Sequence, residues 1–216
     1  MLGAAELREI SQRFPGRWLR GYVRGKLDSD PVYAAAAARI NSKQAPVLDI
    51  GCGIGLFAHY LQALDRHTEY LGIDLDAYKI GLARRAAADA RQIRFEQLAC
   101  ETLPAWQGHV IILDTLHYLG AASQQRLLRE ASLRVAPGAA LVIRSVLRDA
   151  SWRFRVTQLE EFLMHGVRWM RYRALHYPDI EELRAPLAEM GLRVQIEPLW
   201  GRTPFNSYLI VARRAV

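Results

Sequence analysis

Short apolar runs alternate with longer helical patterns along the middle of this 216-residue chain. The runs that predict buried strands lie at 47–50, 70–73, 93–95, 109–113 and 140–146. The helical patterns between them lie at 56–64, 77–91 and 123–135. For the last of these, Ser123 is the expected N-cap and Pro137-Gly138 the stop. Strands that alternate with helices form right-handed βαβ units, so this order predicts a parallel, doubly wound sheet.

The two ends of the chain have other patterns. Residues 1–44 are predicted to be helical, with breaks near Phe14-Pro15-Gly16 and Ser29-Asp30-Pro31, since proline cannot continue a helix. After an amphipathic stretch at 152–173, a helix is expected from Asp179 to about Met190. Strands near 192–196 and 207–212 follow and are joined by a Gly201/Pro204 turn, so they should pair antiparallel.

Composition places the chain among globular proteins. Hydrophobic residues make up 51% of the sequence and charged residues 24%, which suits a single domain over 1–216. No apolar run reaches membrane-spanning length, and the N-terminus lacks the apolar core of a secretory signal. The two cysteines, Cys52 and Cys100, are too few for a disulfide framework. A cytoplasmic location is therefore expected.

The net charge of +7 is unevenly distributed. Residues 1–45 and 144–173 each carry a surplus of four positive charges, while the region between them is nearly neutral. Both basic segments are also rich in aromatic residues, although an arginine-rich composition alone would explain the choice of residue type. Aromatic rings with interleaved arginines suit a flat or apolar substrate that has an anionic portion or an anionic carrier.

The strongest candidate site is the loop Asp49-Ile-Gly-Cys-Gly-Ile-Gly55, between a predicted strand and a predicted helix. Its glycines permit a tight turn and a close approach of backbone to ligand. Asp74 ends the next strand, where a carboxylate can accept hydrogen bonds from both ribose hydroxyls. A nicotinamide enzyme is the alternative, because Gly53-x-Gly55-x-x-Ala58 fits a loose dinucleotide fingerprint. Too few residues follow the fifth strand to build a separate catalytic domain for such an enzyme.

Four segments resemble the motifs of the class I S-adenosylmethionine-dependent methyltransferases. They are Val47–Leu56, Leu71–Asp76, Ile111–Tyr118 and Leu133–Gly138, in the family's order and spacing. The resemblance implies a Rossmann-like α/β fold with a seven-stranded sheet that is mostly parallel and has one antiparallel strand. It also implies a cofactor core at 46–147, a helical cap built from 1–45 and the insertion 148–177, and a closing helix and strand pair at 178–216.

Carried over by position, the resemblance gives S-adenosylmethionine, with S-adenosylhomocysteine as product, a set of contacts. The glycines would contact the methionine portion, Asp74 the ribose and Leu75 the adenine. The expected cofactor residues are Asp49, Gly51, Cys52, Gly53, Gly55, Asp74, Leu75, Cys100, Glu101 and Asp114. One departure is Ala99, which stands where the family often has an aspartate that binds the adenine amino group.

Methyl transfer needs alignment, exclusion of water and, for some acceptors, removal of a proton, but no metal. His117 and Tyr118 follow the fourth strand and are the catalytic candidates, with His117 as a general base or as a positioning residue. Lys26, together with Arg17, could instead hold the cofactor carboxylate. The candidates for the substrate and cap are Trp18, Tyr22, Lys26, Tyr33, Arg153, His165, His176 and Tyr177.

Several acceptors remain open at this stage. Segments such as Arg13–Trp18 and Thr203–Asn206 resemble methyltransferases encoded with bacterial aryl-polyene pigment genes, which implies an aromatic, acyl or polyketide-type metabolite, free or bound to an acyl carrier protein. An RNA methyltransferase is an alternative, although the fourth motif lacks the Asn/Asp-Pro-Pro-Tyr/Phe pattern. A non-catalytic cofactor-binding protein is another. Peripheral membrane contact through 152–173 and a monomeric or homodimeric state are also compatible with the sequence.

Overall fold

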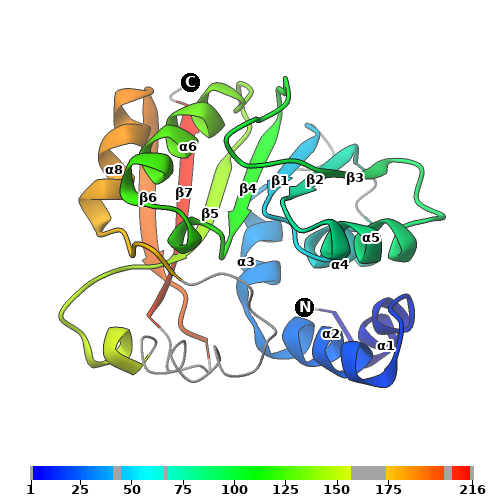
Figure 1. Ribbon diagram of the computed structural model, residues 1–216. Helices are drawn as coiled ribbons and strands as arrows, with labels where there is room; N and C mark the ends of the chain where they lie inside the picture. Colours follow the sequence, from blue (N-terminus) through cyan, green and yellow to red (C-terminus); the bar gives the residue numbers. More distant parts are fainter. Residues whose placement is uncertain (1, 41–44, 66–67, 157–173, 202–205, 215–216) are drawn as a thin grey trace.

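The computed structural model describes residues 2–40, 45–65, 68–156, 174–201 and 206–214. A seven-stranded sheet crosses the molecule in the order β3-β2-β1-β4-β5-β7-β6 (Figure 1). Its strands are β1 (Val47–Ile50), β2 (Tyr70–Asp74), β3 (Ile93–Gln97), β4 (His109–Leu113), β5 (Leu141–Val146), β6 (Leu192–Pro198) and β7 (Ser207–Arg214). Neighbours from β3 to β5 pair parallel, and β7 runs antiparallel to both β5 and β6. The predicted Rossmann-like sheet with one antiparallel strand is confirmed.

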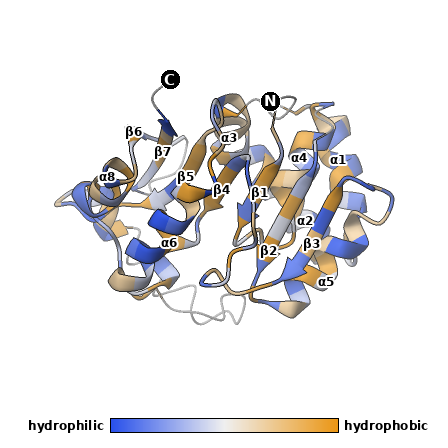
Figure 2. Cartoon of the chain, turned by 90° about the horizontal axis from the view of Figure 1, so that it is seen from above, coloured by the Kyte–Doolittle hydropathy of each residue, from blue (hydrophilic) through white to orange (hydrophobic). Residues whose placement is uncertain are grey.

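Helices cover both faces of the sheet, as the views from the side and from above show (Figures 1 and 2). On one face lie α3 (Val32–Arg39), α4 (Leu56–Ala63) and α5 (Ala77–Ala86), and on the other α6 (Ala121–Leu133) and α8 (Ile180–Glu189). Alternate residues of each central strand supply the two cores: Ile111 of β4 faces α4, while Val110 and Ile112 face α6. Burial on both faces explains why these strands are almost continuously apolar.

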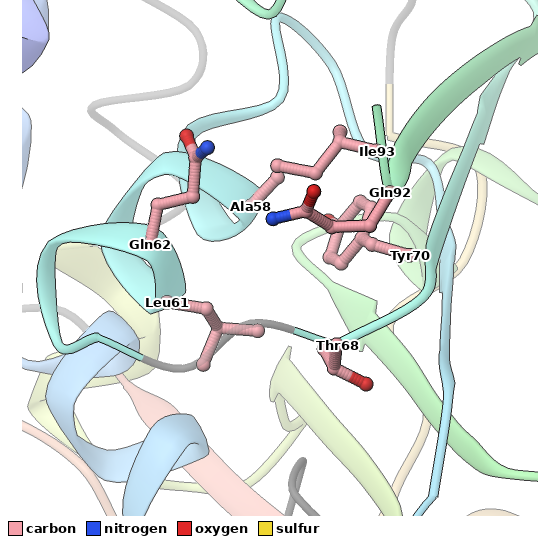
Figure 3. Close-up of a pocket in the computed structure, with 7 residues that line it drawn as sticks. All are labelled: Ala58, Leu61, Gln62, Thr68, Tyr70, Gln92 and Ile93. Atoms are coloured by element: carbon pink, nitrogen blue, oxygen red, sulfur yellow. The ribbon is translucent and has the colours of Figure 1, made fainter. Parts of the chain in front are cut away.

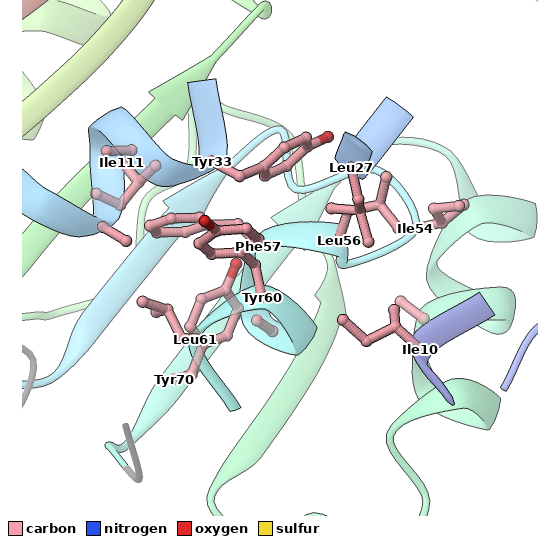
Figure 4. Close-up of a cluster of buried hydrophobic side chains, with 14 of the residues drawn as sticks. Ile10, Leu27, Tyr33, Ile54, Leu56, Phe57, Tyr60, Leu61, Tyr70 and Ile111 are labelled. Atoms are coloured by element: carbon pink, nitrogen blue, oxygen red, sulfur yellow. The ribbon is translucent and has the colours of Figure 1, made fainter. Parts of the chain in front are cut away.

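The N-terminal helices α1 (Ala4–Gln12) and α2 (Arg17–Ser29) pack against α4 (Figure 1). Phe14, in the break between α1 and α2, is 1% exposed, and its ring meets the edge of the His59 ring. Figure 4 shows Leu27 beside Leu56 at the start of α4 and Tyr33 near the aromatic side chains of that helix, where the Tyr33 and Tyr60 rings lie 5.9 Å apart. The N-terminal segment is thus joined to the domain through a shared core.

Some element boundaries differ from the sequence expectation. Helix α6 begins at Ala121 with Gly120 as N-cap, so Ser123 is not the cap; its hydroxyl instead accepts a hydrogen bond from Arg126. Helix α5 ends at Ala86 rather than near residue 91, because hydrogen-bonded turns over 87–93 must reverse the chain into β3. Of the expected amphipathic stretch, 152–156 is helical and 157–173 lies outside the described residues.

Candidate cofactor and substrate site

The loops after β1, β2 and β4 meet at the carboxyl edge of the sheet. The amides of Gly51 and Cys52 donate to the carbonyl of Ile73, at 2.8 and 3.0 Å. The Gly53 amide donates to Oδ2 of Asp74 at 2.9 Å, which joins the glycine loop to the end of β2. These bonds place the predicted ribose-binding carboxylate directly beside the predicted methionine-binding loop.

The three loop glycines all have positive φ angles, of 77°, 57° and 79° for Gly51, Gly53 and Gly55. A Cβ on Gly51 would overlap the side chain of Thr115, and one on Gly55 would overlap the ring of Phe95. No atom of the described residues lies within 4 Å of a Cβ built on Gly53. The backbone at Gly53 is therefore open to a ligand. At Gly51 and Gly55 the corresponding space is already filled by the side chains of Thr115 and Phe95.

Asp74 and Leu75 form the second part of the site. The Oδ1 atom of Asp74 accepts from the Asp76 amide at 2.8 Å, so the carboxylate is held by backbone donors on both oxygens. A carboxylate has about four acceptor positions, which leaves room for ribose hydroxyls. Leu75 is 54% exposed, so its side chain is accessible to a flat apolar group at this edge of the sheet. An open glycine, a fixed carboxylate and an exposed apolar side chain fit the predicted cofactor.

Asp49 lies beneath the loop rather than in it. Its carboxyl group is 2% exposed and accepts a hydrogen bond from the Tyr70 hydroxyl. Burial raises the pKa of Asp49 to about 7, against the lowering effect of the Tyr70 hydrogen bond. The Asp49 side chain therefore supports the loop from inside the sheet.

Neither cysteine at this edge is placed as a nucleophile. Burial raises the pKa of Cys52 well above its usual value, and it raises the pKa of Cys100 to about 11. A thiol with such a pKa is protonated at neutral pH and reacts slowly. Cys100 and Glu101 follow β3, and the Cys100 thiol lies 3.5 Å from Oε2 of Glu101.

The turn after β4 carries the catalytic candidates. Asp114 has a φ of 57°, and the 3₁₀ helix η1 (Leu116–Tyr118) follows it. The ring centroids of His117 and Tyr118 are 4.1 Å apart, and the Tyr177 ring lies nearly parallel to His117 at 6.1 Å. The amide of Leu175 donates to the His117 carbonyl at 2.7 Å. The segment before α8 is thus bonded to this turn, which brings Tyr177 to the two candidates.

The predicted cap residues fall into different surroundings. Trp18 is 59% exposed and stacks on Tyr22 at 6.1 Å, whereas Tyr33 is buried in the core. The His176 ring pairs with Glu182 of α8 at 3.1 Å and so faces that helix. His165 lies outside the described residues.

Arg153 lies between two indole rings. Its guanidinium carbon is 4.9 Å from the centre of the Trp152 ring and 4.5 Å from that of Trp200. Such cation–π contacts hold the guanidinium in place. The sequence analysis singled out Arg153 but not Trp200, which follows β6.

Sequence reasoning missed four residues that shape the site: Thr115, Tyr70, Arg144 and Asp30. Arg144 offered a signal, because it is the charged residue of an otherwise apolar strand. Asp30 offered none beyond the helix break, since its partner Arg144 is 114 residues away in sequence. Lys26, one of the predicted residues, lies in an ion cluster with Asp30, Asp114 and Arg144.

The cavity in Figure 3 lies at the opposite end of the strands. Its walls come from α4 and from the starts of β2 and β3, and its volume is about 10 Å³. It has room for about one water molecule and none for a cofactor. Among the described residues there is no cluster of three metal-ligating side chains and no helix long and apolar enough to cross a membrane.

The sheet order and the glycine loop at its carboxyl edge define a Rossmann-like domain for a nucleotide-type cofactor. Residues 47–138 match the family model described as "Methyltransferase domain". This match agrees with the resemblance of the sequence motifs to the class I S-adenosylmethionine-dependent methyltransferases. S-adenosylmethionine is the cofactor of this family, which confirms that prediction.

Known proteins extend the likeness. A carboxy-S-adenosyl-L-methionine synthase from Trichodesmium erythraeum is 28% identical over 116 residues, which are 51% of this chain and 46% of that protein. The chain therefore spans about half the length of this curated relative.

Two solved structures share the fold. Magnesium protoporphyrin IX methyltransferase from Synechocystis PCC 6803, with bound S-adenosylhomocysteine, has a TM-score of 0.66 at 17% identity and covers 98% of this chain and 93% of its own. An O-methyltransferase family protein from Burkholderia thailandensis has a TM-score of 0.67 at 18% identity. The match covers 91% of this chain and 59% of that protein.

Proposed function

We propose that the protein transfers a methyl group from S-adenosylmethionine to a small aromatic, acyl or polyketide-type molecule that has an anionic portion or is attached to an acyl carrier protein. The observation that carries the proposal is the junction of the open Gly53 backbone with the Asp74 carboxylate, directly beside the turn that holds His117 and Tyr118.

The cofactor would supply an activated methyl group, so the protein need only bind, align and exclude water. In the proposed arrangement the loop at Gly53 holds the methionine portion, Asp74 the ribose and Leu75 the adenine. Ala99 offers no side-chain acceptor for the adenine amino group, so a backbone acceptor near Cys100 would serve instead.

For an acceptor hydroxyl or amine, the same turn could take up the proton that is released. The imidazole of His117 is the group at this position whose ordinary pKa is nearest to neutrality. Contacts with Tyr118 and Tyr177 hold the imidazole, and this restricts it to a narrow range of orientations. We propose His117 as the base or, for a carbon acceptor, as a positioning group.

The substrate would lie between this turn and the Arg153 site. The Tyr177 ring contacts both His117 and Phe154, and Phe154 adjoins Arg153 in the chain. An apolar or flat group beside Tyr177 and an anion at Arg153 would therefore be bound by neighbouring residues.

Product analysis tests this proposal. The protein is incubated with S-adenosylmethionine carrying a deuterated methyl group and with a metabolite extract, and the products are identified by mass spectrometry. We expect S-adenosylhomocysteine to accumulate while the labelled methyl group appears in a small molecule or on a carrier protein. Label only in RNA would contradict the proposal, as would no transfer by a protein that binds the cofactor.

The curated relative favours a second candidate function, in which S-adenosylmethionine is itself the molecule that is modified. The two functions differ in the nucleoside product. Methyl transfer leaves S-adenosylhomocysteine, whereas carboxylation would replace one deuterium of the methyl group by a carboxylate from a carboxylic-acid donor in the extract and leave a heavier sulfonium that keeps the other two deuterium atoms. The same mass spectrum therefore separates them.

A further inference from the structure

Four charged side chains meet where the N-terminal helices touch the carboxyl ends of β4 and β5. Lys26 and Asp30 come from the end of α2, Asp114 follows β4, and Arg144 lies in β5. We call these four residues the ion cluster. Lys26 Nζ is 2.6 Å from Asp30 and 3.8 Å from Asp114, and Arg144 is hydrogen-bonded to Asp114 and lies 3.3 Å from Asp30. Two cations and two anions make the cluster electrically neutral.

Two members of the ion cluster are buried and two are partly exposed. The side chains of Asp30 and Arg144 are 8% and 9% exposed, while those of Lys26 and Asp114 are 29% and 34% exposed. Arg144 also donates to the Ser207 hydroxyl of β7 at 3.0 Å, which fixes it to the sheet. The cluster thus runs from the sheet interior to the edge where the cofactor loop lies.

Charges at such depth are stable only while they are paired. Burial opposes the ionisation of Asp30, but Arg144 and Lys26 outweigh it, so the pKa of Asp30 lies below its usual value. Burial likewise opposes the charge on Arg144, yet Asp114 and Asp30 raise its pKa. The same two carboxylates raise the pKa of Lys26 against the effect of burial, so Lys26, Asp30 and Arg144 are charged at neutral pH. The loss of one charge leaves an unbalanced partner at the site.

Asp114 connects the ion cluster to the cofactor loop. Its backbone has a φ of 57°, which is unfavourable for a residue with a side chain, and its amide donates to the Arg144 carbonyl at 3.1 Å. The next residue, Thr115, donates to the Ile50 carbonyl at 3.4 Å and occupies the space that a side chain on Gly51 would take. A shift of Asp114 would therefore move the residue that packs on the glycine loop.

We propose that Arg144 and Asp30 are positioning residues that, through Lys26 and Asp114, couple the seating of helix α2 to the shape of the cofactor loop. The inference rests on the proposed function, because it takes the loop to bind S-adenosylmethionine. Binding of the cofactor then stabilises α2 in place, and a seated α2 makes binding tighter, since such coupling is reciprocal.

Charge balance provides a specific test by calorimetric titration of S-adenosylmethionine. Lys26→Met leaves the cluster one charge negative and Asp30→Asn leaves it one charge positive, so we expect each single variant to weaken binding about tenfold. The double variant is neutral again, and asparagine can still accept the Val32 amide hydrogen bond. We expect its affinity to return to within about threefold of the wild type.

Hydrogen exchange gives a readout that is independent of affinity. In the wild type, we expect addition of S-adenosylmethionine to slow exchange of the amides of α2 (Arg17–Ser29). In Arg144→Met this protection should be lost, and Arg144→Lys should restore part of it. The control is the exposed pair Arg129–Glu189, at 2.7 Å, where Arg129→Met should change neither the affinity nor the exchange of α2.

The outcomes separate the inference from the proposed function. If the wild type does not bind S-adenosylmethionine, the proposed function fails. If the wild type binds and folded single variants bind equally well, the inference alone is wrong. It is also wrong if the double variant shows the sum of the two single losses, because the side chains would then act independently. A variant that unfolds is replaced by Arg144→Lys, for which unchanged exchange protection would overturn the coupling.

Discussion

Gly51, Gly53 and Gly55 all have positive φ angles, but their surroundings differ. Thr115 and Phe95 close the space at the first and the third, while the second is open. The sequence showed three equivalent glycines, and only the structure separates packing from ligand access. At the scale of single residues, the same amino acid thus serves the fold at two positions and the ligand at one.

A substitution at Gly51 should harm stability more than its small size suggests. In Gly51→Ala the new methyl group overlaps Thr115 and the left-handed backbone is disfavoured, so we expect a loss of more than about 1 kcal/mol in the free energy of unfolding. Gly81→Ala is the control, because Gly81 lies inside α5 with open space around it and should gain about 0.5–1 kcal/mol. Urea denaturation measures both; equal effects would contradict the steric account.

Two buried titratable groups, Asp49 and His59, should give opposite pH dependences of stability. Burial, followed by the charge of Arg13, lowers the pKa of His59 to about 4. The unfolded chain then takes up this proton first, and stability falls as the pH drops from about 6.5 to 4. The pKa of Asp49 is raised to about 7, so the folded chain holds a proton that the unfolded chain releases. Its contribution is lost as the pH rises from about 4 to 7.

Substitution should separate the two contributions. From pH 5 to pH 7, the free energy of unfolding of Asp49→Asn should rise by about 2 kcal/mol more than that of the wild type, because the variant lacks the Asp49 contribution that is lost over this interval. His59→Gln should have the reverse effect, a relative loss of about 2 kcal/mol over the same interval. Urea denaturation at a series of pH values measures these slopes, and parallel curves for all three proteins would refute the assignment.

At the scale of elements, the apolar runs were sufficient to predict where the seven strands lie along the chain, and the family resemblance implied a mostly parallel sheet with one antiparallel strand. Boundaries were less predictable, because they depend on where a chain must turn. Helix α5 stops at Ala86 although its alanines and arginines favour helix well beyond that point. The ion cluster as a whole was not predictable, since Arg144 lies 30 positions from Asp114 and 114 positions from Asp30 in the sequence.

The start of α8 offers a direct test at this scale. Asp179 accepts from the amides of Glu181 and Glu182, and the Glu182 side chain accepts from the Asp179 amide, which forms a capping box. We expect Asp179→Ala to reduce the free energy of unfolding by about 1 kcal/mol. Asp179→Ser keeps a capping oxygen and should lose much less. Thermal unfolding distinguishes them; an equal loss would show that the ion pair with Arg148, not the cap, matters.

At the scale of the whole molecule, the surplus charge lies outside the central methyltransferase motifs. Part of this surplus is accounted for by the structure: Lys26 and Arg144 are neutralised within the ion cluster, and Arg153 is held between two indole rings. These three basic residues are therefore held in place by specific partners rather than being only solvated surface charges. A small-molecule enzyme of this kind should not shift RNA in a gel at physiological salt, in contrast to a nucleic-acid methyltransferase.

The central claim is that the junction of the glycine loop and Asp74 binds S-adenosylmethionine, and calorimetric titration tests it most directly. We expect the wild type to bind S-adenosylmethionine and S-adenosylhomocysteine, and Asp74→Ala, while still folded, to bind both at least about tenfold more weakly. Asp89→Ala, which removes an exposed carboxylate in the turn after α5, should bind like the wild type. No binding by the wild type, or unchanged binding by folded Asp74→Ala, would contradict the account.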